Sequence, residues 1–332
     1  MDKRKIIFRA DGGSSIGMGH FIRTLALAEM LKDDFYCIYA TQSPTAYQIN
    51  EIESVCLERI DLPADETHFD IFISLLKGNE IVVLDNYYFS TQYQQLIKNK
   101  GCKLVCIDDL HDKHFVCDVV INHAEGISKS QYSAEKHTSY CLGYKYALLR
   151  KDYLTNDPNE MSKQYSCLVI MGGADPFNLT AKLISMIEPL QLSLPIAVVV
   201  GAVYENEHLF EPFNSIKIFK GIKSIEVLKL MKKSQFGIFP ASTVALEAAA
   251  ARLPFICGYF VENQIEIYSG IKMGNLAICI GDYFNLETND LYTAIENLTS
   301  KEMSKTIIQN QKSLLDKQSK ERFIKIFSQI WE

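Results

Sequence analysis

A histidine at the end of a glycine-rich segment is the first residue of this chain whose type and setting suit catalysis. The segment runs from residue 8 to His20 and follows an apolar run. Glycines let other groups approach the backbone closely, and the unpaired N–H groups at a helix start attract anions. Because imidazole changes charge near neutral pH, His20 is a candidate general base. A structural tight turn without a ligand fits the same residues.

The glycine spacing in this segment does not match two common nucleotide-binding patterns. Gly12, Gly13, Gly17 and Gly19 give no G-x-G-x-x-G in register, and no acidic residue clearly ends the second predicted strand to hold a ribose. The G-K-[ST] ending of a nucleoside-triphosphate loop is also missing. We therefore expect neither kind of site at this loop.

A second glycine pair repeats the arrangement in the other half of the chain. Gly172 and Gly173 follow an apolar run and precede a helical pattern. Asp175 suits the N-cap of that helix, and Pro176 suits its first turn. A ligand loop and a well-capped turn both fit this segment.

Hydroxyl groups and a carboxylate stand together further along. Ser242 and Thr243 precede an alanine-rich helix and offer hydroxyl and N–H groups to an anion. Glu247 lies about one turn into that helix, where its carboxylate is placed to accept hydrogen bonds from a ribose diol. An ordinary capped helix with an acidic residue near its start is the alternative.

Amide and phenol side chains supply two weaker candidates. Asn263 and Gln264 follow another apolar run, and adjacent amides suit sugar hydroxyl or acetamido groups. Tyr87 follows the run that ends at Asp85 and either reaches a ligand or packs in the interior. A plain polar loop fits each segment equally.

A metal site is not expected. His111 and His114 lie near Cys102 and Cys106, but their H-x₂-H and C-x₃-C spacings fall on a loop and a strand. Zinc sites need four converging ligands, commonly with closer pairs such as C-x₂-C. Surface histidines are the better interpretation, and no cofactor is implied.

Alternating strands and helices are predicted to position the candidate residues described above. Short β-rich runs alternate with helical patterns, which indicates βα units and a mostly parallel sheet. Strands are expected at residues 5–9, 35–41, 81–86, 103–107, 118–122, 165–171, 196–200, 216–219, 236–239, 255–259 and 276–280. Residues 21–31 and 93–99 have helical patterns, and so does the tail from 301 to 331. A polar, turn-rich linker at residues 151–164 separates a first domain (1–150) from a second (165–332) that includes the C-terminal helices.

Composition narrows the class of protein. The chain has 332 residues, of which 48% are hydrophobic and 22% charged, and its net charge is −6. No global basic field favours nucleic acid, and no apolar run reaches membrane-spanning length. Nine scattered cysteines fit reduced thiols. We expect a cytoplasmic protein, and its oligomeric state stays open.

Several blocks of residues together resemble one enzyme family. They begin with Arg9-x-Asp11 and Ile16-Gly17-x-Gly19-His20-x-x-Arg23, and continue at residues 84–87, 107–109, 146–150, 171–175, 241–248 and 263–264. In this order they resemble the UDP-sugar hydrolases of pseudaminic acid biosynthesis. The family is similar in fold to the GT-B glycosyltransferases, which implies an α/β protein with two Rossmann-like domains facing across a cleft. In that fold the C-terminal helices are expected to pack back toward the first domain.

The resemblance also implies roles for these residues. His20 would be the base that activates water in a metal-independent hydrolysis at the anomeric carbon of a UDP-linked diacetamido-trideoxy sugar. Tyr87 and Asn263 match catalytic positions. The positions expected to bind the UDP-sugar are Arg9, Asp11, Gly17, Gly19, Arg23, Gly172, Gly173, Ser242, Thr243, Val244, Glu247 and Gln264. Among them, residues 242–244 would hold the diphosphate and Glu247 the ribose.

Two other functions remain compatible with the sequence. A glycosyltransferase of the same fold would pass the sugar to an acceptor, and fold does not distinguish the two because one scaffold hosts both. A nucleotide-sugar binding protein would hold UDP without turnover.

Overall fold

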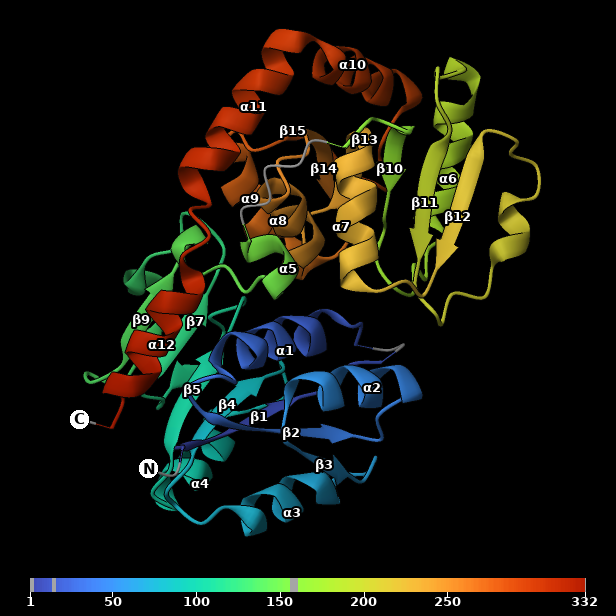
Figure 1. Cartoon of the computed structure of the whole chain (residues 1–332). Coiled ribbons are helices and arrows are strands. Elements are labelled where there is room, and N and C mark those ends of the chain that lie inside the picture. Colours follow the sequence, from blue (N-terminus) through green and yellow to red (C-terminus); the bar gives the residue numbers. More distant parts are fainter. Residues whose placement is uncertain (1–2, 14–15, 156–160, 332) are drawn as a thin grey trace. The chain divides into compact units, whose positions relative to one another are not determined.

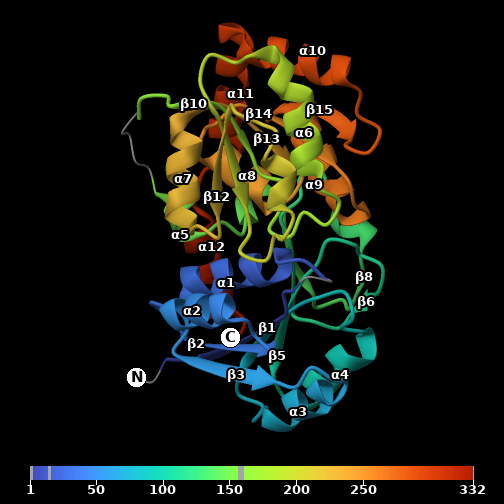
Figure 2. The ribbon, with the colours of Figure 1, turned by 90° about the vertical axis from the view of Figure 1, so that its right-hand side faces the viewer.

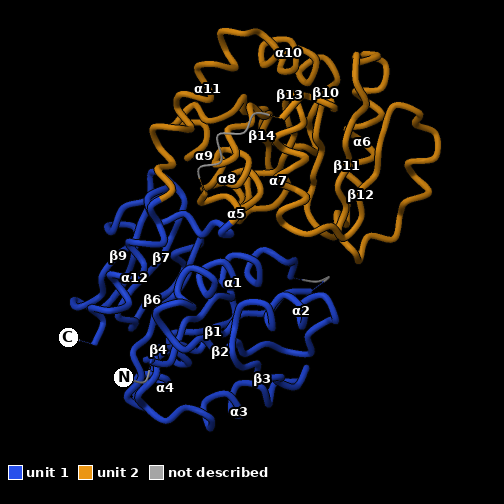
Figure 3. Tube along the Cα trace, viewed as in Figure 1, with its two compact units in different colours: residues 1–151, 318–332 blue, residues 152–317 orange. Residues whose placement is uncertain are grey.

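The computed structural model describes residues 3–13, 16–155 and 161–331. Ser14 and Ser15 of the glycine-rich segment and residues 156–160 of the expected linker lie outside the described residues. The chain divides into two compact units, one formed by residues 1–151 and 318–332 and the other by residues 152–317 (Figures 1 and 3).

The first unit is built on a seven-stranded sheet in which all neighbouring strands pair in parallel. Its spatial order is β3 (Glu58–Leu62), β2 (Tyr36–Gln42), β1 (Lys5–Ala10), β4 (Ile81–Asp85), β5 (Lys103–Ile107), β7 (Val119–Asn122) and β9 (Ser139–Leu142). The central strands β1, β4 and β5 are almost wholly buried, as expected for a sheet covered on both faces. A small pair, β6 (His114–Phe115) and β8 (Ser133–Ala134), lies beside it.

The helices of the first unit connect these strands. They are α1 (Gly19–Leu31), α2 (Ala46–Val55), α3 (Thr67–Leu75) and α4 (Thr91–Asn99), with α12 (Ser319–Gln329) returning from the far end of the chain. Local sequence sets their starts. Thr45 and Gln48 form a capping box on α2, and the Ser90 hydroxyl accepts from the Tyr93 N–H at the start of α4.

The second unit contains a six-stranded parallel sheet. Its order is β12 (Ile216–Lys220), β11 (Ile196–Val200), β10 (Tyr165–Val169), β13 (Ser234–Pro240), β14 (Phe255–Tyr259) and β15 (Ile278–Asp282). The helices are α6 (Leu179–Ile187), α7 (Ser224–Lys233), α8 (Thr243–Ala250), α9 (Ile265–Met273), α10 (Thr288–Thr299) and α11 (Lys301–Leu314). The short helix α5 (Lys151–Leu154) spans the boundary between the units.

Helices cover both faces of the second sheet, as right-handed crossovers require. The chain moves from β10 to β11 in one direction across the sheet and from β12 to β15 in the other. The connecting helix α6 therefore lies on the face opposite to α7, and Figure 2 shows these two helices on either side of the strands. Helix α10 contacts α6 and shares its hydrophobic core.

Both sheets have a point at which the strand order reverses. In the first unit it lies between β1 and β4, and in the second between β10 and β13. Open α/β sheets bind ligands beyond the carboxyl ends of the strands at such points. The loops that leave these four strands are therefore the places to examine for a site.

The expected strands are all present, with ends that differ by two residues at most. The sequence did not reveal β3 or β9, which are the two edge strands of the first sheet. The burial of β3 alternates weakly, and β9 is only four residues long, so neither leaves a strong apolar run.

The C-terminal tail differs from the expectation in two respects. It forms two helices, α11 and α12, separated by residues 315–318, instead of one helical run. Helix α12 also lies in the first unit and not in the second. The reason is a pair of aromatic contacts, because Phe327 packs against Phe35 and Phe323 against Tyr146, both in the first unit.

Two further findings bear on the class of protein. Among the residues that the structure describes, no helix has the length and apolarity needed to cross a membrane. The cysteines carry free thiols, and all are buried except Cys279, which is half-buried.

Candidate active site

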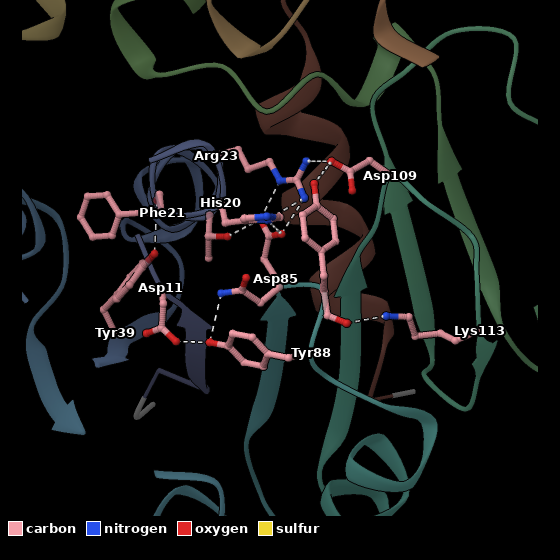
Figure 4. A network of polar contacts seen from close by, with 12 residues as sticks. Asp11, His20, Phe21, Arg23, Tyr39, Asp85, Tyr88, Asp109 and Lys113 are labelled. Carbon is pink, nitrogen blue, oxygen red and sulfur yellow. Dashed lines mark hydrogen bonds and ion pairs between the residues drawn. The ribbon is translucent and has the colours of Figure 1, made fainter. Parts of the chain in front are cut away.

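Three neighbouring strand ends of the first unit bring a charged cluster together. His20 is the second residue of α1, which follows β1. Asp85 is the last residue of β4, and Asp109 lies two residues beyond β5. Because β1, β4 and β5 are adjacent, these side chains converge at the carboxyl edge of the sheet, as Figure 4 shows. All three are at least nine-tenths buried.

Asp85 fixes the orientation of the His20 imidazole. The His20 Nδ1 atom lies 2.7 Å from Asp85 Oδ1. Burial alone would raise the pKa of Asp85, but the charges of Arg23 and His20 beside it hold this pKa well below its usual range. Asp85 is therefore a carboxylate, and it accepts from His20 in the tautomer that carries its proton on Nδ1. In that tautomer the Nε2 atom is the acceptor, which is the form that a general base needs.

Arg23 joins the two carboxylates. Its Nε and Nη2 atoms donate to Asp85 at 2.7 and 2.6 Å, and Nη1 donates to Asp109 at 2.8 Å. Burial would lower the pKa of Arg23, but Asp109 and Asp85 hold it well above its usual value. The Thr24 hydroxyl adds a fourth bond to Asp85, at 2.7 Å. Every oxygen of Asp85 is thus held by a donor, which leaves this carboxylate little freedom to move.

Tyr87 stands over His20. The two rings meet edge to face with centroids 4.5 Å apart. The Tyr87 hydroxyl donates to Asp109 Oδ2 at 3.3 Å, and its backbone carbonyl accepts from Lys113 Nζ at 2.9 Å. Through Asp85 and Asp109, the side chains of His20, Arg23 and Tyr87 therefore lie in one network. Figure 4 shows its part around His20, Arg23 and the two carboxylates.

Arg9 and Asp11 form a second buried pair. Arg9 Nη1 lies 2.6 Å from Asp11 Oδ1, and Asp11 also accepts from the Thr41 hydroxyl and from the Tyr88 hydroxyl. The second Arg9 nitrogen approaches His68 Nδ1 at 3.0 Å. Both members of the pair are buried, and their predicted contact with a UDP-sugar stays a prediction.

The glycine-rich segment needs glycine at two positions. A Cβ on Gly12 would lie 2.8 Å from the Phe21 Cβ, and Gly17 has a φ of +75°. The Gly13 N–H donates to the Gly17 carbonyl at 3.1 Å. Gly19 is the first residue of α1, and a Cβ there would meet open space.

The glycine pair of the second unit leaves β10 as expected. Gly172 has a φ of +100°, and Gly173 packs so closely on Gly201 that a Cβ on Gly201 would overlap the Gly173 carbonyl. The N-cap prediction is corrected: α6 begins at Leu179, its N-cap is Asn178, and Pro176 precedes the first turn. The Asp175 carboxylate still caps the helix, because it accepts from two of its N–H groups.

Ser242 is the N-cap of α8, directly after β13. Its side chain makes no capping bond, so the Ser242 hydroxyl is not used by the helix. Thr243 and Val244 form the first turn and carry N–H groups that have no partner within a helix. Glu247 lies in the same helix and is only 2% exposed.

Asn263 and Gln264 belong to a short 3₁₀ turn, Glu262–Gln264, which follows β14. The Gln264 side-chain oxygen accepts from the Phe260 N–H at 3.0 Å, so this amide holds the loop. The β10, β13 and β14 loops carry Gly172, Ser242 and Asn263 from neighbouring strands. The second unit therefore gathers its candidates at one sheet edge, as the first unit does.

Sequence reasoning missed Asp85 and Asp109 as site residues. The signal was present, since each carboxylate follows a short apolar run that reads as a strand end. A carboxylate in such a place is often a loop residue, and only the strand order shows that both face Arg23. Among the described residues, no group of three or more His, Cys, Asp or Glu side chains is arranged to hold a metal ion.

The fold defines a class of protein. The chain matches MurG of Acinetobacter baumannii with a TM-score of 0.65 over 98% of this chain and 99% of that one, at 12% identity. It matches a glycosyltransferase of Rickettsia africae with a TM-score of 0.67 over the whole of both chains, at 12% identity. These likenesses confirm the expected GT-B-like α/β fold with two Rossmann-like units.

Among proteins of known sequence, the likeness is more specific. The chain is 28% identical over 275 residues to the UDP-2,4-diacetamido-2,4,6-trideoxy-β-L-altropyranose hydrolase of Campylobacter jejuni, covering 78% of this chain and 93% of that protein. An uncharacterized protein of Methanocaldococcus jannaschii is 27% identical over 284 residues, which is 80% of this chain and 57% of that protein. No family model matches the chain. The resemblance expected from the motifs is thus confirmed.

Proposed function

We propose that this protein hydrolyses a UDP-linked diacetamido-trideoxy sugar at its anomeric carbon and releases UDP and the free sugar. The observation that carries the proposal is the buried contact of 2.7 Å between His20 Nδ1 and Asp85 Oδ1 at the switch point of the first sheet. The likeness to the Campylobacter hydrolase supports the choice of substrate. The free sugar would serve nonulosonic (pseudaminic) acid biosynthesis.

In the proposed step, His20 acts on water. The Nε2 atom takes a proton from a water molecule as its oxygen bonds to the anomeric carbon. The bond from that carbon to the diphosphate oxygen breaks, and UDP leaves with the electron pair. Asp85 stabilises the positive charge that His20 acquires, because its carboxylate already accepts the Nδ1 proton. A single displacement of this kind inverts the anomeric configuration.

Tyr87 and Arg23 would act in different ways. Tyr87 lies against the imidazole edge and would contact the sugar beside the reacting carbon. Arg23 is fully engaged with two carboxylates, so it would position Asp85 rather than bind the substrate. Arg9 and Asp11 form a buried ion pair with each other, which would support the strand end beside the substrate. Gly17 and Gly19 would leave room for the substrate near His20.

The second unit would hold the nucleotide. The Ser242 hydroxyl and the N–H groups of Thr243 and Val244, at the start of α8, suit a diphosphate because a helix N-terminus carries partial positive charge. Gly172 and Gly173 would let the diphosphate approach the backbone closely. Glu247 would accept hydrogen bonds from the ribose, and Asn263 and Gln264 would lie near the sugar. A UDP leaving group needs little further activation, so no metal is required by the proposal.

The test is direct. The purified chain is incubated with UDP-2,4-diacetamido-2,4,6-trideoxyhexoses, without acceptor and in the presence of EDTA, while NMR follows UDP and the released sugar. We expect UDP release with the inverted sugar as the first product. Release that needs an added acceptor would instead indicate a glycosyltransferase of cell-surface polysaccharide synthesis, the alternative that the MurG-like fold keeps open. UDP binding with neither outcome would indicate a non-catalytic binding protein.

The place of this reaction follows from its substrate. Nucleotide sugars with modified acetamido groups are small polar molecules, so an enzyme that consumes one needs neither nucleic acid nor an integral membrane segment. The nine free thiols agree with a reducing compartment. We propose the cytoplasm as the site of action.

A further inference from the structure

Three phenylalanines from separate loops form a cluster in the second unit, in which Phe177 and Phe284 are exposed and Phe260 is half-buried against the core. Phe177 follows β10, Phe260 follows β14 and Phe284 follows β15. The Phe177 ring meets the Phe284 ring edge to face at 5.1 Å and the Phe260 ring at 6.1 Å. Phe177 is 51% exposed and Phe284 48% exposed. We call these three residues the aromatic platform.

Such exposure is unusual for rings that have neighbours to pack against. Large aromatic side chains favour burial, and exposed apolar groups that gather at one place commonly mark a binding surface. All three rings stand at the carboxyl edge of a parallel sheet, where α/β proteins bind ligands. The platform is therefore placed where a ligand is expected.

The loops that carry the platform are held by specific bonds. Lys182 Nζ, from α6, donates to the backbone carbonyls of Tyr283 and Phe284 at 2.7 and 3.0 Å. The Phe284 N–H donates to Asp282 Oδ1 at 2.9 Å, and the Phe260 N–H is held by Gln264. A surface fixed in this way loses little conformational entropy when a ligand binds.

The backbone around Phe177 keeps its ring outside the core. Asp175 and Asn178 flank the Pro176-Phe177 pair, and both have left-handed φ angles, +37° and +53°. Non-glycine residues adopt such angles at a cost, although Asp and Asn tolerate them best. The Asp175 carboxylate, which caps α6, fixes this conformation. The loop is thus shaped to present Phe177 and not to bury it.

Its neighbours indicate what the platform binds. Asn263 and Gln264, the amides suited to acetamido groups, belong to the same loop as Phe260. Glu247, the proposed ribose contact, lies in α8, on the sheet face opposite to α6 and α10. The platform follows the strand ends on the α6 and α10 face, so it belongs with the sugar end of a bound nucleotide sugar and not with the nucleoside.

We infer that the aromatic platform binds the apolar substituents of a deoxy, acetamido sugar: the C6 methyl group and the acetamido methyl groups. A 2,4-diacetamido-2,4,6-trideoxyhexose carries three such methyl groups, whereas an ordinary hexose presents hydroxyls. Phenylalanine offers no polar edge, so it favours methyl groups over hydroxyl groups at the same place. This inference rests on the proposed function and assigns the sugar specificity to Phe177, Phe260 and Phe284.

The test is a binding measurement in the full chain carrying His20→Ala, which slows hydrolysis. Calorimetry measures the affinities for UDP, UDP-N-acetylglucosamine and a UDP-2,4-diacetamido-2,4,6-trideoxyhexose. The proteins compared are this chain alone and the same chain that also carries Phe177→Ala or Phe284→Ala. We expect each substitution to weaken binding of the diacetamido sugar about tenfold and to change UDP binding less than about twofold. The preference for this sugar over N-acetylglucosamine should fall as well. In saturation-transfer NMR, the sugar methyl protons should lose their contact signal.

Met273→Ala is the matched control, because Met273 is a large exposed side chain (59%) at the far end of α9. It should leave all three affinities unchanged. If the platform substitutions weaken UDP as much as the UDP-sugar, the rings contact the nucleoside and the inference is wrong. Unchanged affinities for every ligand would overturn it too. Since binding is read without turnover, failure of the proposed hydrolysis, seen as absent UDP release by the wild-type chain, is distinguishable from failure of the platform.

Discussion

The carboxyl edges of the two sheets share a topology but differ in chemistry. In the first unit this edge carries buried charges, Arg23 between Asp85 and Asp109, with His20 attached to them. In the second unit the corresponding edge carries glycines, a serine, two amides and exposed phenylalanine rings. Backbone N–H groups and neutral side chains dominate there.

The difference indicates a division of work. The charged groups of the first unit leave one net negative charge among Arg23, Asp85 and Asp109, which suits a neighbouring imidazole that becomes positive during proton transfer. Neutral N–H groups at a helix start bind an anionic diphosphate without a fixed cation that would hold it after reaction. On the proposed function, the first edge would carry the reaction, and the second would hold and release the nucleotide.

Removing the imidazole should produce the largest effect. His20→Ala is expected to lower kcat by about 10²–10⁴-fold, the usual contribution of general-base catalysis, while UDP affinity stays within about twofold. NMR of UDP release and calorimetry with UDP measure the two quantities. Nearly full turnover by the folded variant would contradict the role of His20 as the base.

Neutralising the central carboxylate should affect both stability and rate. Asp85→Asn leaves the buried Arg23 with one carboxylate instead of two, which should lower the free energy of unfolding by about 3–5 kcal/mol. The amide that replaces the carboxylate can also donate to the His20 Nδ1 atom, and the imidazole proton then moves to Nε2. The base would be lost in that form, so kcat should fall at least tenfold.

Asp109→Asn is the comparison for that variant. It also weakens the Arg23 pairing but leaves the His20–Asp85 contact intact. We expect a similar loss of stability in urea unfolding with a smaller loss of kcat. Equal losses of kcat in the two variants would show that Asp85 has no special role in orienting His20.

A new negative charge at the second edge should weaken nucleotide binding without changing the stability of the fold. Aspartate is as good an N-cap as serine, so Ser242→Asp should leave stability unchanged. Its carboxylate would repel the diphosphate, and UDP affinity should fall about tenfold or more. Ser242→Ala adds no charge and should lower the UDP affinity less than Ser242→Asp does. If the Asp variant binds UDP as tightly as the wild-type chain, the diphosphate does not bind at the start of α8.

The last prediction concerns the pH dependence of stability and is confined to the first edge. Burial, and secondly the charge of Arg23, lower the pKa of His123 to about 4, whereas an unfolded histidine titrates near 6.5. Between these values the unfolded chain binds a proton that the folded chain does not. Stability is therefore lost as the pH falls, by about 2 kcal/mol from pH 7 to pH 5 for this residue.

His123→Gln should remove that part of the pH dependence, as measured by urea unfolding at pH 7 and pH 5. The exposed His208, substituted in the same way, is the control and should leave the dependence unchanged. If the His123 variant loses as much stability on acidification as the wild-type chain, His123 does not titrate as its burial implies.

The sequence predicted the central strands well because each is a short, nearly continuous apolar run. It was weakest at the edges of the first sheet, where β3 and β9 are only partly buried and carry no such run. It also placed the C-terminal tail within the bounds of the second domain, and only the resemblance to the GT-B fold implied that these helices pack back toward the first, as α12 does. Nothing local in α12 indicates that Phe323 and Phe327 pack against residues in the first half of the chain.

By itself, the sequence determined the α/β class, the two βα units, and the positions of the glycine loop, His20 and the start of α8. Local propensity and apolar periodicity suffice for these. Tertiary structure alone decided that Asp85 and Asp109 share Arg23 and that Asp85 orients His20, because strand order sets which loops meet. It also decided that Phe177, Phe260 and Phe284 form one surface. Parallel strands bring together residues far apart in the chain, and no local pattern records that pairing.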